Sequence, residues 1–147
     1  MHANVISDDE ARVAELCRSA RRVAVLGIKT DAQRDQPAFY VPEALQRGGV
    51  EIVPVPVYYP EVTTILGARV YRTVAAVPGP IDIVDVFRRS RDVAAHVDDI
   101  LEKAPRAVWL QSGIRDDAAA ERFAAAGILV VQERCLMVDF QHHAGRR

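Results

Sequence analysis

The chain of 147 residues carries a formal net charge of −1, and 50% of its residues are hydrophobic. That length can bury a core of its own, so we expect a single domain over residues 1–147. A net charge so close to zero argues against a nucleic-acid or membrane-surface partner. No apolar run reaches the roughly 18 residues of a membrane span, and the acidic, polar N-terminus does not resemble a secretory signal. We therefore expect a cytoplasmic protein.

Apolar runs alternate with helical patterns along the chain. The runs that suit buried strands are residues 23–26, 50–57, 81–87, 107–111 and 128–132. The helical patterns cover residues 8–19, 90–103 and 118–126, together with a helix that starts at Pro37 or Pro42 and ends before Gly48. This alternation predicts an α/β fold, a Rossmann-like doubly wound parallel sheet of about five strands with helices on both faces, in three layers.

Local signals define several element ends. Ser7 and Glu10 have the spacing of a capping box for the first helix, and Ser90 stands where the third helix should begin. Asp82 and Asp85 are unusual in a strand buried on both faces, so we expect them at the strand ends or bonded to neighbouring backbone.

The remaining segments are less regular. Residues 58–80 predict an irregular excursion, with a short pairing near residues 69–71 and a helical turn at residues 73–77. Residues 135–143 form a last helix or a strand end, and residues 144–147 are expected to be a frayed tail.

Gly27 stops the first strand and opens a polar loop that leads into a helix. This arrangement favours a phosphate site, because backbone N–H groups and the helix dipole attract an anion there. A missing side chain at Gly27 would let a ligand approach the strand end. The dinucleotide fingerprint needs three glycines, and this loop continues with Ile28, Lys29 and Thr30, so a standard NAD site is disfavoured. A strand-to-helix turn without a ligand remains the alternative.

Other candidate residues follow the carboxyl ends of the strands, which line the ligand crevice in this class of sheet. Lys29 and Arg34 could bind phosphate as charged donors. Phe87 could flank an adenine ring or simply fill the core. The run Gln111, Ser112 and Gly113 offers amide and backbone donors to a polar ligand.

A catalytic set is not apparent, so we do not expect an enzyme or a metal site. None of the four histidines follows a strand, and the adjacent pair His142 and His143 is a poor metal site. Ser112 has no histidine near it in sequence. Cys17 and Cys135 are too far apart to suggest a disulfide framework, and Cys135 could either face the crevice or be an inert buried thiol.

Several segments match one family in the same order along the chain. These segments are VAVLG, QPAFYVPEAL, PVPVYYP with ILG, IDIVDVFRRS, VWLQSGI and ERCLMVDF. From about residue 21 to residue 140 the chain resembles the stand-alone CoA-binding domain proteins, which are similar to the CoA-binding domain of the succinyl-CoA synthetase α subunit. The resemblance implies a Rossmann-like domain that binds coenzyme A through its ADP half and has no established enzymatic activity of its own.

The resemblance also implies where the ligand would lie. The pyrophosphate would fall on two segments of the first loop, namely Gly27, Ile28 and Lys29, then Gln36, Pro37, Ala38 and Tyr40. The adenosine would be bordered by Val55, Pro56 and Val57. Phe87 and Arg88 would stand at the next strand end, with Gln111 across the cleft.

Two departures from the family pattern reduce the polar contacts. The family usually has P-V-N-P where this chain has residues 54–57, PVPV, and usually has arginine or lysine where this chain has Gln36. Lys29 or Arg34 could supply the missing charge.

We therefore expect a non-catalytic binder of CoA or acyl-CoA. One alternative is a subunit or regulator of a CoA ligase or transferase that needs a second chain. Another is a sensor of NAD or an adenine nucleotide, which the missing glycines oppose. A homodimer or a protein partner is left open.

Overall fold

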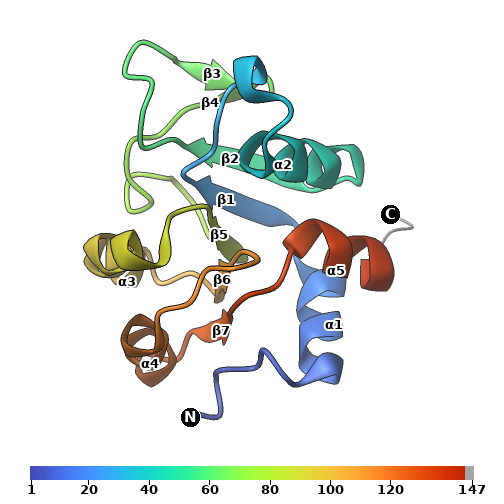
Figure 1. The fold of residues 1–147 in the computed structure, drawn as a ribbon, viewed down its shortest axis with the longest axis vertical. Helices are drawn as coiled ribbons and strands as arrows, with labels where there is room; N and C mark the ends of the chain where they lie inside the picture. The colour runs from blue at the N-terminus through green and yellow to red at the C-terminus, as the bar shows by residue number, and fades with distance from the viewer. Residues whose placement is uncertain (145–147) are drawn as a thin grey trace.

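The computed structural model describes residues 1–144, and its centre is a five-stranded parallel sheet in the order β2-β1-β5-β6-β7 (Figure 1). The strands are β1 (Arg22–Leu26), β2 (Glu51–Val55), β5 (Ile83–Val86), β6 (Ala107–Leu110) and β7 (Leu129–Val131). The helices are α1 (Glu10–Ser19), α2 (Pro37–Arg47), α3 (Val97–Lys103), α4 (Asp117–Ala125) and α5 (Leu136–Ala144), with 3-10 helices η1 (Asp31–Gln33) and η2 (Ser90–His96). An antiparallel pair, β3 (Thr64–Ile65) and β4 (Ala68–Arg69), follows β2.

This topology confirms the predicted three-layer α/β sheet. Helices α1, α2 and α5 cover one face, where Leu16 and Leu45 are buried in the same core as Trp109 of β6 (Figure 1). Helices α3 and α4 cover the other face, where Ile100 and Phe123 belong to a second core. Strand side chains alternate between the faces, so an unbroken apolar strand supplies both cores. Among the described residues, no helix is long and apolar enough to span a membrane.

Each edge of the sheet has its own backbone arrangement. At the β7 edge, Val5 forms an isolated parallel bridge with Val130. The N–H of Val130 donates to the Asn4 carbonyl at 2.9 Å, and the Val130 carbonyl accepts from the Ile6 N–H at 2.8 Å. At the opposite edge, β2 contains Pro54, which has no N–H to donate. The N-terminal segment thus lies along one edge of the sheet.

Two of the predicted caps are wrong. Asp9, not Ser7, is the N-cap of α1 and accepts from the Arg12 N–H, while the Ser7 hydroxyl accepts from the Gln132 N–H at 2.8 Å. Ser90 does not cap a helix; its hydroxyl accepts from a backbone N–H of the β6–α4 loop at 3.0 Å. Both serines serve contacts that are distant in sequence, which capping rules do not consider.

The two aspartates of the third strand behave differently. Asp82 accepts the N–H groups of Arg21 and Arg22 at 2.8 and 2.9 Å, as expected. Asp85 is wrongly predicted: it lies in the middle of β5 with no exposed surface, and neither carboxyl oxygen has a hydrogen-bond partner. Burial raises the pKa of the Asp85 carboxyl well above its usual range. The strand therefore carries a polar group at considerable energetic cost.

The irregular segment and the tail need smaller corrections. The second strand ends at Val55, short of the predicted residue 57. The short pairing lies between β3 and β4, slightly before the predicted position, and residues 73–77 form turns rather than a helical turn. The last segment is the helix α5 and includes Ala144; the other residues of the predicted frayed tail, 145–147, lie outside the described residues.

Candidate functional site

The carboxyl ends of β1, β5 and β6 surround a cavity of about 580 Å³, here called the crevice cavity. Strand β1 lies between β2 and β5. The chain passes from β1 to β2 on one side and then crosses over to β5 on the other, so the strand order reverses at β1. Ligands of doubly wound sheets bind at such a reversal, outside the carboxyl ends of the strands. The residues that line the crevice cavity are Lys29, Gln36, Pro37, Ala38, Tyr40, Val41, Phe87, Arg88, Arg89, Ser90, Gln111, Ser112, Gly113, Ile114 and Cys135.

Lys29 and the start of α2 form the first polar wall of the crevice cavity. The Lys29 ammonium donates to the side-chain oxygen of Gln36, and the Lys29 N–H donates to the Ala38 carbonyl at 3.1 Å. Gln36 is the N-cap of α2 but makes no side-chain cap bond, and Pro37 occupies the first turn. An ammonium group and an uncapped helix N-terminus both favour an anion.

Arg88 forms the second cationic wall, and its guanidinium is held from several sides. Its Nε donates to Nε2 of His96 at 3.1 Å, its Nη1 lies 3.5 Å from the Tyr58 hydroxyl, and its Nη2 is 3.9 Å from Asp92. The guanidinium also lies 5.8 Å from the centre of the Tyr58 ring. Burial, and then the charge of Arg88, lower the pKa of His96. A neutral His96 can accept the Arg88 hydrogen bond.

Gln111 contributes a neutral donor. The residue is only 4% exposed, and its side-chain oxygen accepts from the Leu136 N–H at 3.0 Å. Its side-chain nitrogen has no hydrogen-bond partner among residues 1–144. Ser112 and Gly113 are exposed in the turn that follows, where Gly113 has a φ of 80°. A buried amide donor at a cavity wall is suited to a ligand carbonyl.

The other residues predicted for the ligand lie elsewhere. Pro56 and Val57 line a second cavity of about 660 Å³, which also contacts His96 and is here called the adjacent cavity. The side chains of Ile28 and Val55 are buried in the two cores.

The side chains of Thr30 and Arg34 in the first loop also make contacts away from the crevice cavity. The Thr30 side chain accepts from the Ala32 N–H at the start of η1, and Arg34 is exposed and donates to the Asp31 carbonyl. Neither Thr30 nor Arg34 lines the crevice cavity. Of the two cations proposed to bind phosphate, the structure therefore places only Lys29 at the crevice cavity.

The structure requires glycine at position 27 because of a close contact within the protein, and not because of the ligand approach that was predicted. Its φ is 86°, and a Cβ built on it would lie 2.3 Å from the Phe87 carbonyl oxygen. The Gly27 N–H donates to the Val55 carbonyl, and the Phe87 N–H donates to the Leu26 carbonyl. The close approach is therefore made by the protein's own backbone between the ends of β1 and β5.

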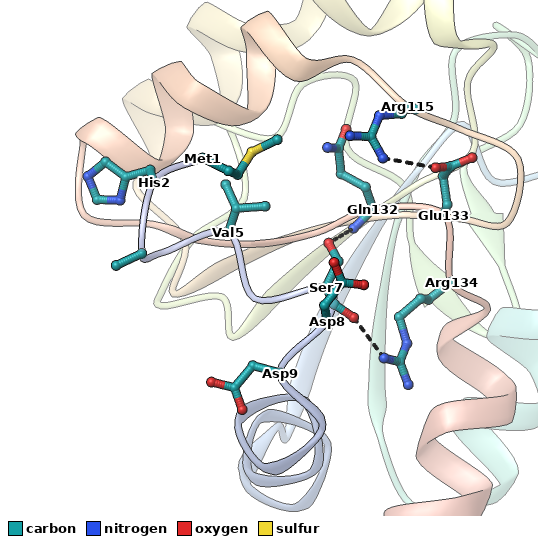
Figure 2. A pocket seen from close by; sticks show the side chains of 11 residues that line it. Met1, His2, Val5, Ser7, Asp8, Asp9, Arg115, Gln132, Glu133 and Arg134 are labelled. Carbon is teal, nitrogen blue, oxygen red and sulfur yellow. Dashed lines mark hydrogen bonds and ion pairs between the residues drawn. The ribbon is translucent and has the colours of Figure 1, made fainter.

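A larger cavity of about 700 Å³ lies beyond β7, beside the N-terminal segment, and is here called the edge cavity (Figure 2). Both arginines of its lining are paired with carboxylates of the protein. Arg115 contacts Glu133 at 3.1 Å and Asp117 at 3.0 Å, and Arg134 forms a bidentate pair with Asp139. Figure 2 shows the Arg115–Glu133 pair on the wall of this cavity. Its size alone does not make it the better candidate.

One cluster has the composition of a metal site. Ligand atoms of Glu10, Asp139 and His143 lie within 4.8 Å of one another. Arg134 contacts Glu10 at 2.6 Å and Asp139 at 2.7 Å, and its side-chain hydrogen bond is the main cause of the lowered pKa of Glu10. The guanidinium thus already supplies the positive charge that a cation would bring, and we treat the cluster as an ion-pair network.

Sequence reasoning missed some lining residues. Val41, Ser90 and Ile114 line the crevice cavity but were not among the candidates. Ser90 and Ile114 follow strand-end residues that were predicted, so a longer window at each strand end would have included them. His96 gave no signal, because its contact with Arg88 depends on how η2 folds back.

Comparisons with known proteins identify the family. The family model described as "CoA binding domain" matches residues 21–141. The uncharacterized protein YneT of Bacillus subtilis (strain 168) is 30% identical over 129 residues, which cover 88% of this chain and 92% of YneT.

Solved structures show the same fold. Cell-free ID.343 from Thermus thermophilus superposes with a TM-score of 0.82 at 33% identity, over 91% of this chain and 98% of that one. The apo form of the dinucleotide-forming acetyl-coenzyme A synthetase 1 of Ca. Korarchaeum cryptofilum has a TM-score of 0.64 at 18% identity, over 80% of this chain and 27% of the synthetase. The synthetase likeness concerns the fold, whereas the family match covers most of the sequence, and this chain belongs to the CoA-binding domain family.

Proposed function

We propose that this chain is a non-catalytic binder of CoA or acyl-CoA, with the ligand held through its ADP half at the carboxyl ends of the strands. The observation that carries the proposal is that Lys29, Arg88 and the unpaired amide of Gln111 line one cavity, although they come from three different strand ends. Two cations and one neutral donor suit a ligand with a charged pyrophosphate and an uncharged amide arm.

The arrangement of the two cavities suggests a path for the ligand. The pyrophosphate would lie between Lys29 and Arg88, near the start of α2. The adenosine would extend toward Pro56 and Val57 in the adjacent cavity, past the Arg88 side chain. The pantetheine arm would run past Phe87 and reach Gln111.

The absence of catalysis is proposed from the chemistry of the lining. Among the described residues, the side chains that line the crevice cavity include no carboxylate and no histidine. Histidine and carboxylate side chains are the commonest general acids and bases in enzymes. The fold of the acetyl-CoA synthetase favours one alternative, in which this chain assists a CoA ligase or transferase and a second chain supplies those groups.

Calorimetric titration of the purified chain with CoA tests the proposal. We expect saturable binding with a dissociation constant on the order of micromolar, about −8 kcal/mol. Titrations with 3′-dephospho-CoA, ADP and NADH in parallel show which part of the ligand is recognised. Tighter binding of NADH than of CoA, or no heat with millimolar CoA, would contradict the proposal.

A further inference from the structure

Cys135 lies where the chain passes from β7 into α5, and it lines the crevice cavity. Its backbone is fixed on both sides. The carbonyl of Arg134 accepts from the indole N–H of Trp109 at 2.7 Å, and the carbonyl of Cys135 accepts from the Asp139 N–H at 3.1 Å. Cys135 is partly buried, whereas the other cysteine, Cys17, is fully buried in α1. Cys135 therefore belongs to the cavity wall and has a fixed backbone position.

The unpaired amide of Gln111 lies beside this thiol and independently indicates a ligand. The side-chain oxygen of Gln111 is bound to the N–H of Leu136, which is the peptide that joins Cys135 to α5. The side-chain nitrogen has no protein partner in residues 1–144, although the residue is 96% removed from solvent. Among the described residues, the buried side-chain polar atoms that lack a partner are the two Asp85 oxygens. The Gln111 nitrogen is therefore open to the cavity, where it can donate to an acceptor brought by a bound molecule.

The chemistry of the proposed ligand matches this pair of groups. The pantetheine arm of CoA carries two amide carbonyls and ends in a thiol. With the pyrophosphate near Lys29, an amide carbonyl of the arm can accept from Gln111 at the far side of the same cavity. Strand β7, which leads to Cys135, lies next to β6, so an arm that continues from Lys29 past Gln111 would bring the terminal sulfur toward Cys135.

We propose that Cys135 is a thiol–disulfide exchange site for the pantetheine thiol of a bound CoA, an inference that rests on the proposed function. The oxidant is the disulfide form of the ligand. The Cys135 thiolate attacks one sulfur of that disulfide, the ligand S–S bond breaks, and one CoA leaves as its thiolate. Cys135 and the retained CoA sulfur are now joined, and a reducing thiol reverses the step.

Intact-protein mass spectrometry after treatment with CoA disulfide tests this inference. We expect the mass of one CoA to be added, to map to Cys135 by peptide analysis, and to disappear on reduction. Pantethine has the same arms and sulfurs without the nucleotide, so it should react at least about tenfold more slowly, because binding raises the effective concentration of the CoA disulfide. Excess ADP should slow the reaction with CoA disulfide and leave that with pantethine unchanged.

Two variants act as controls. Cys135→Ser should give no adduct, which also shows that Cys17 does not react. Gln111→Glu keeps the acceptor for the Leu136 N–H but loses the donor, so it should slow exchange with CoA disulfide severalfold. Because the added carboxylate can slow any attack by the neighbouring thiol, a small neutral disulfide serves as the reference. The ratio of the CoA disulfide rate to this reference rate should fall severalfold.

The result separates this inference from the proposed function. If reduced CoA binds in calorimetry but CoA disulfide reacts no faster than pantethine, the exchange site is wrong and the CoA-binding function stands. If the adduct forms on Cys17, or if neither cysteine reacts, the exchange site is equally excluded. If reduced CoA does not bind at all, the proposed function fails and this inference fails with it.

Discussion

The crevice cavity and the edge cavity differ in how their polar groups are used. The edge cavity is larger, but its arginines are neutralised by carboxylates of the protein: Arg115 by Glu133 (Figure 2) and Arg134 by Asp139. In the crevice cavity, Lys29 is bound only by a neutral amide, and the nitrogen of Gln111 has no partner in the described chain. The two arginines of its lining, Arg88 and Arg89, both contact Asp92, at 3.9 and 3.1 Å. A cation that is held by neutral groups can still attract an anionic ligand, whereas a paired cation mainly stabilises the fold.

The largest expected effect concerns the edge region and stability. Arg134→Met would leave Asp139, which is 8% exposed, without its bidentate partner. We expect a loss of about 3 kcal/mol in the free energy of unfolding, measured by urea denaturation, because an unpaired buried charge is costly. CoA affinity should not change.

Arg122→Met provides a matched control for that measurement. Arg122 pairs with Asp98, and both side chains are mostly exposed, at 56% and 90%. An exposed pair contributes about 0–1 kcal/mol, so this variant should be almost as stable as the wild type. Equal losses of unfolding free energy for Arg134→Met and Arg122→Met would show that the buried Arg134–Asp139 pair stabilises the fold no more than an exposed pair does.

The next effect concerns the crevice cavity and binding. Lys29→Ala should weaken CoA binding by about 10- to 100-fold in calorimetry, since a charge-assisted hydrogen bond contributes about 1.5–3 kcal/mol. Arg115→Ala removes a cation from the edge cavity instead, and its affinity for CoA should match that of the wild type. If Arg115→Ala weakens binding more than Lys29→Ala, the two cavities have been assigned the wrong way round.

The smallest effect is a pH dependence that should be confined to the crevice cavity. His96 has a lowered pKa and accepts from Arg88, so it is neutral above its usual value of about 6.5 and loses this bond as the pH falls through the lowered pKa. Besides Arg88, the charged groups around it are Asp92 and Asp99, which favour protonation, and Arg72, Asp98 and Glu102, which share the adjacent cavity.

We therefore expect CoA affinity to fall severalfold in acid, because a protonated His96 repels Arg88 and releases it from its position. His96→Gln keeps an acceptor that does not titrate, so the affinity of this variant should depend less on pH. The stability contribution of the neutral histidine has the same sign: it is present above the unfolded pKa and is lost on acidification. Identical pH profiles for His96→Gln and the wild type would contradict this role.

The sequence predicted the layers of the fold well and the polar contacts less well. Apolar periodicity gave the five strands, because burial on both faces leaves few positions for polar residues. The strand-end rule named Lys29 and Gln111, the family resemblance added Arg88, and the structure places all three around one cavity. Such rules depend on the class of sheet and not on the details of packing.

The misses share a physical cause. Ser7 contacts a residue more than a hundred positions away, and His96 contacts Arg88 only because η2 turns back on the strand end. Asp85 lies in the middle of β5, although the local rule for polar residues predicted it at a strand end. The first two misses depend on tertiary contacts, and the third depends on a desolvation cost that the fold tolerates. Neither of these causes leaves a periodic signal in the sequence.

The backbone at the two edges of the sheet has a consequence for how this chain associates. An exposed strand edge is a template for another chain, and proteins commonly block it. Here the N–H and carbonyl of Val130 are both taken by the N-terminal segment. At the other edge Pro54 has no N–H, and its carbonyl accepts from Tyr71 at 2.9 Å. Neither edge offers a free ladder at these positions, so a partner or a second copy that docks there would contact side chains rather than add a strand to the sheet.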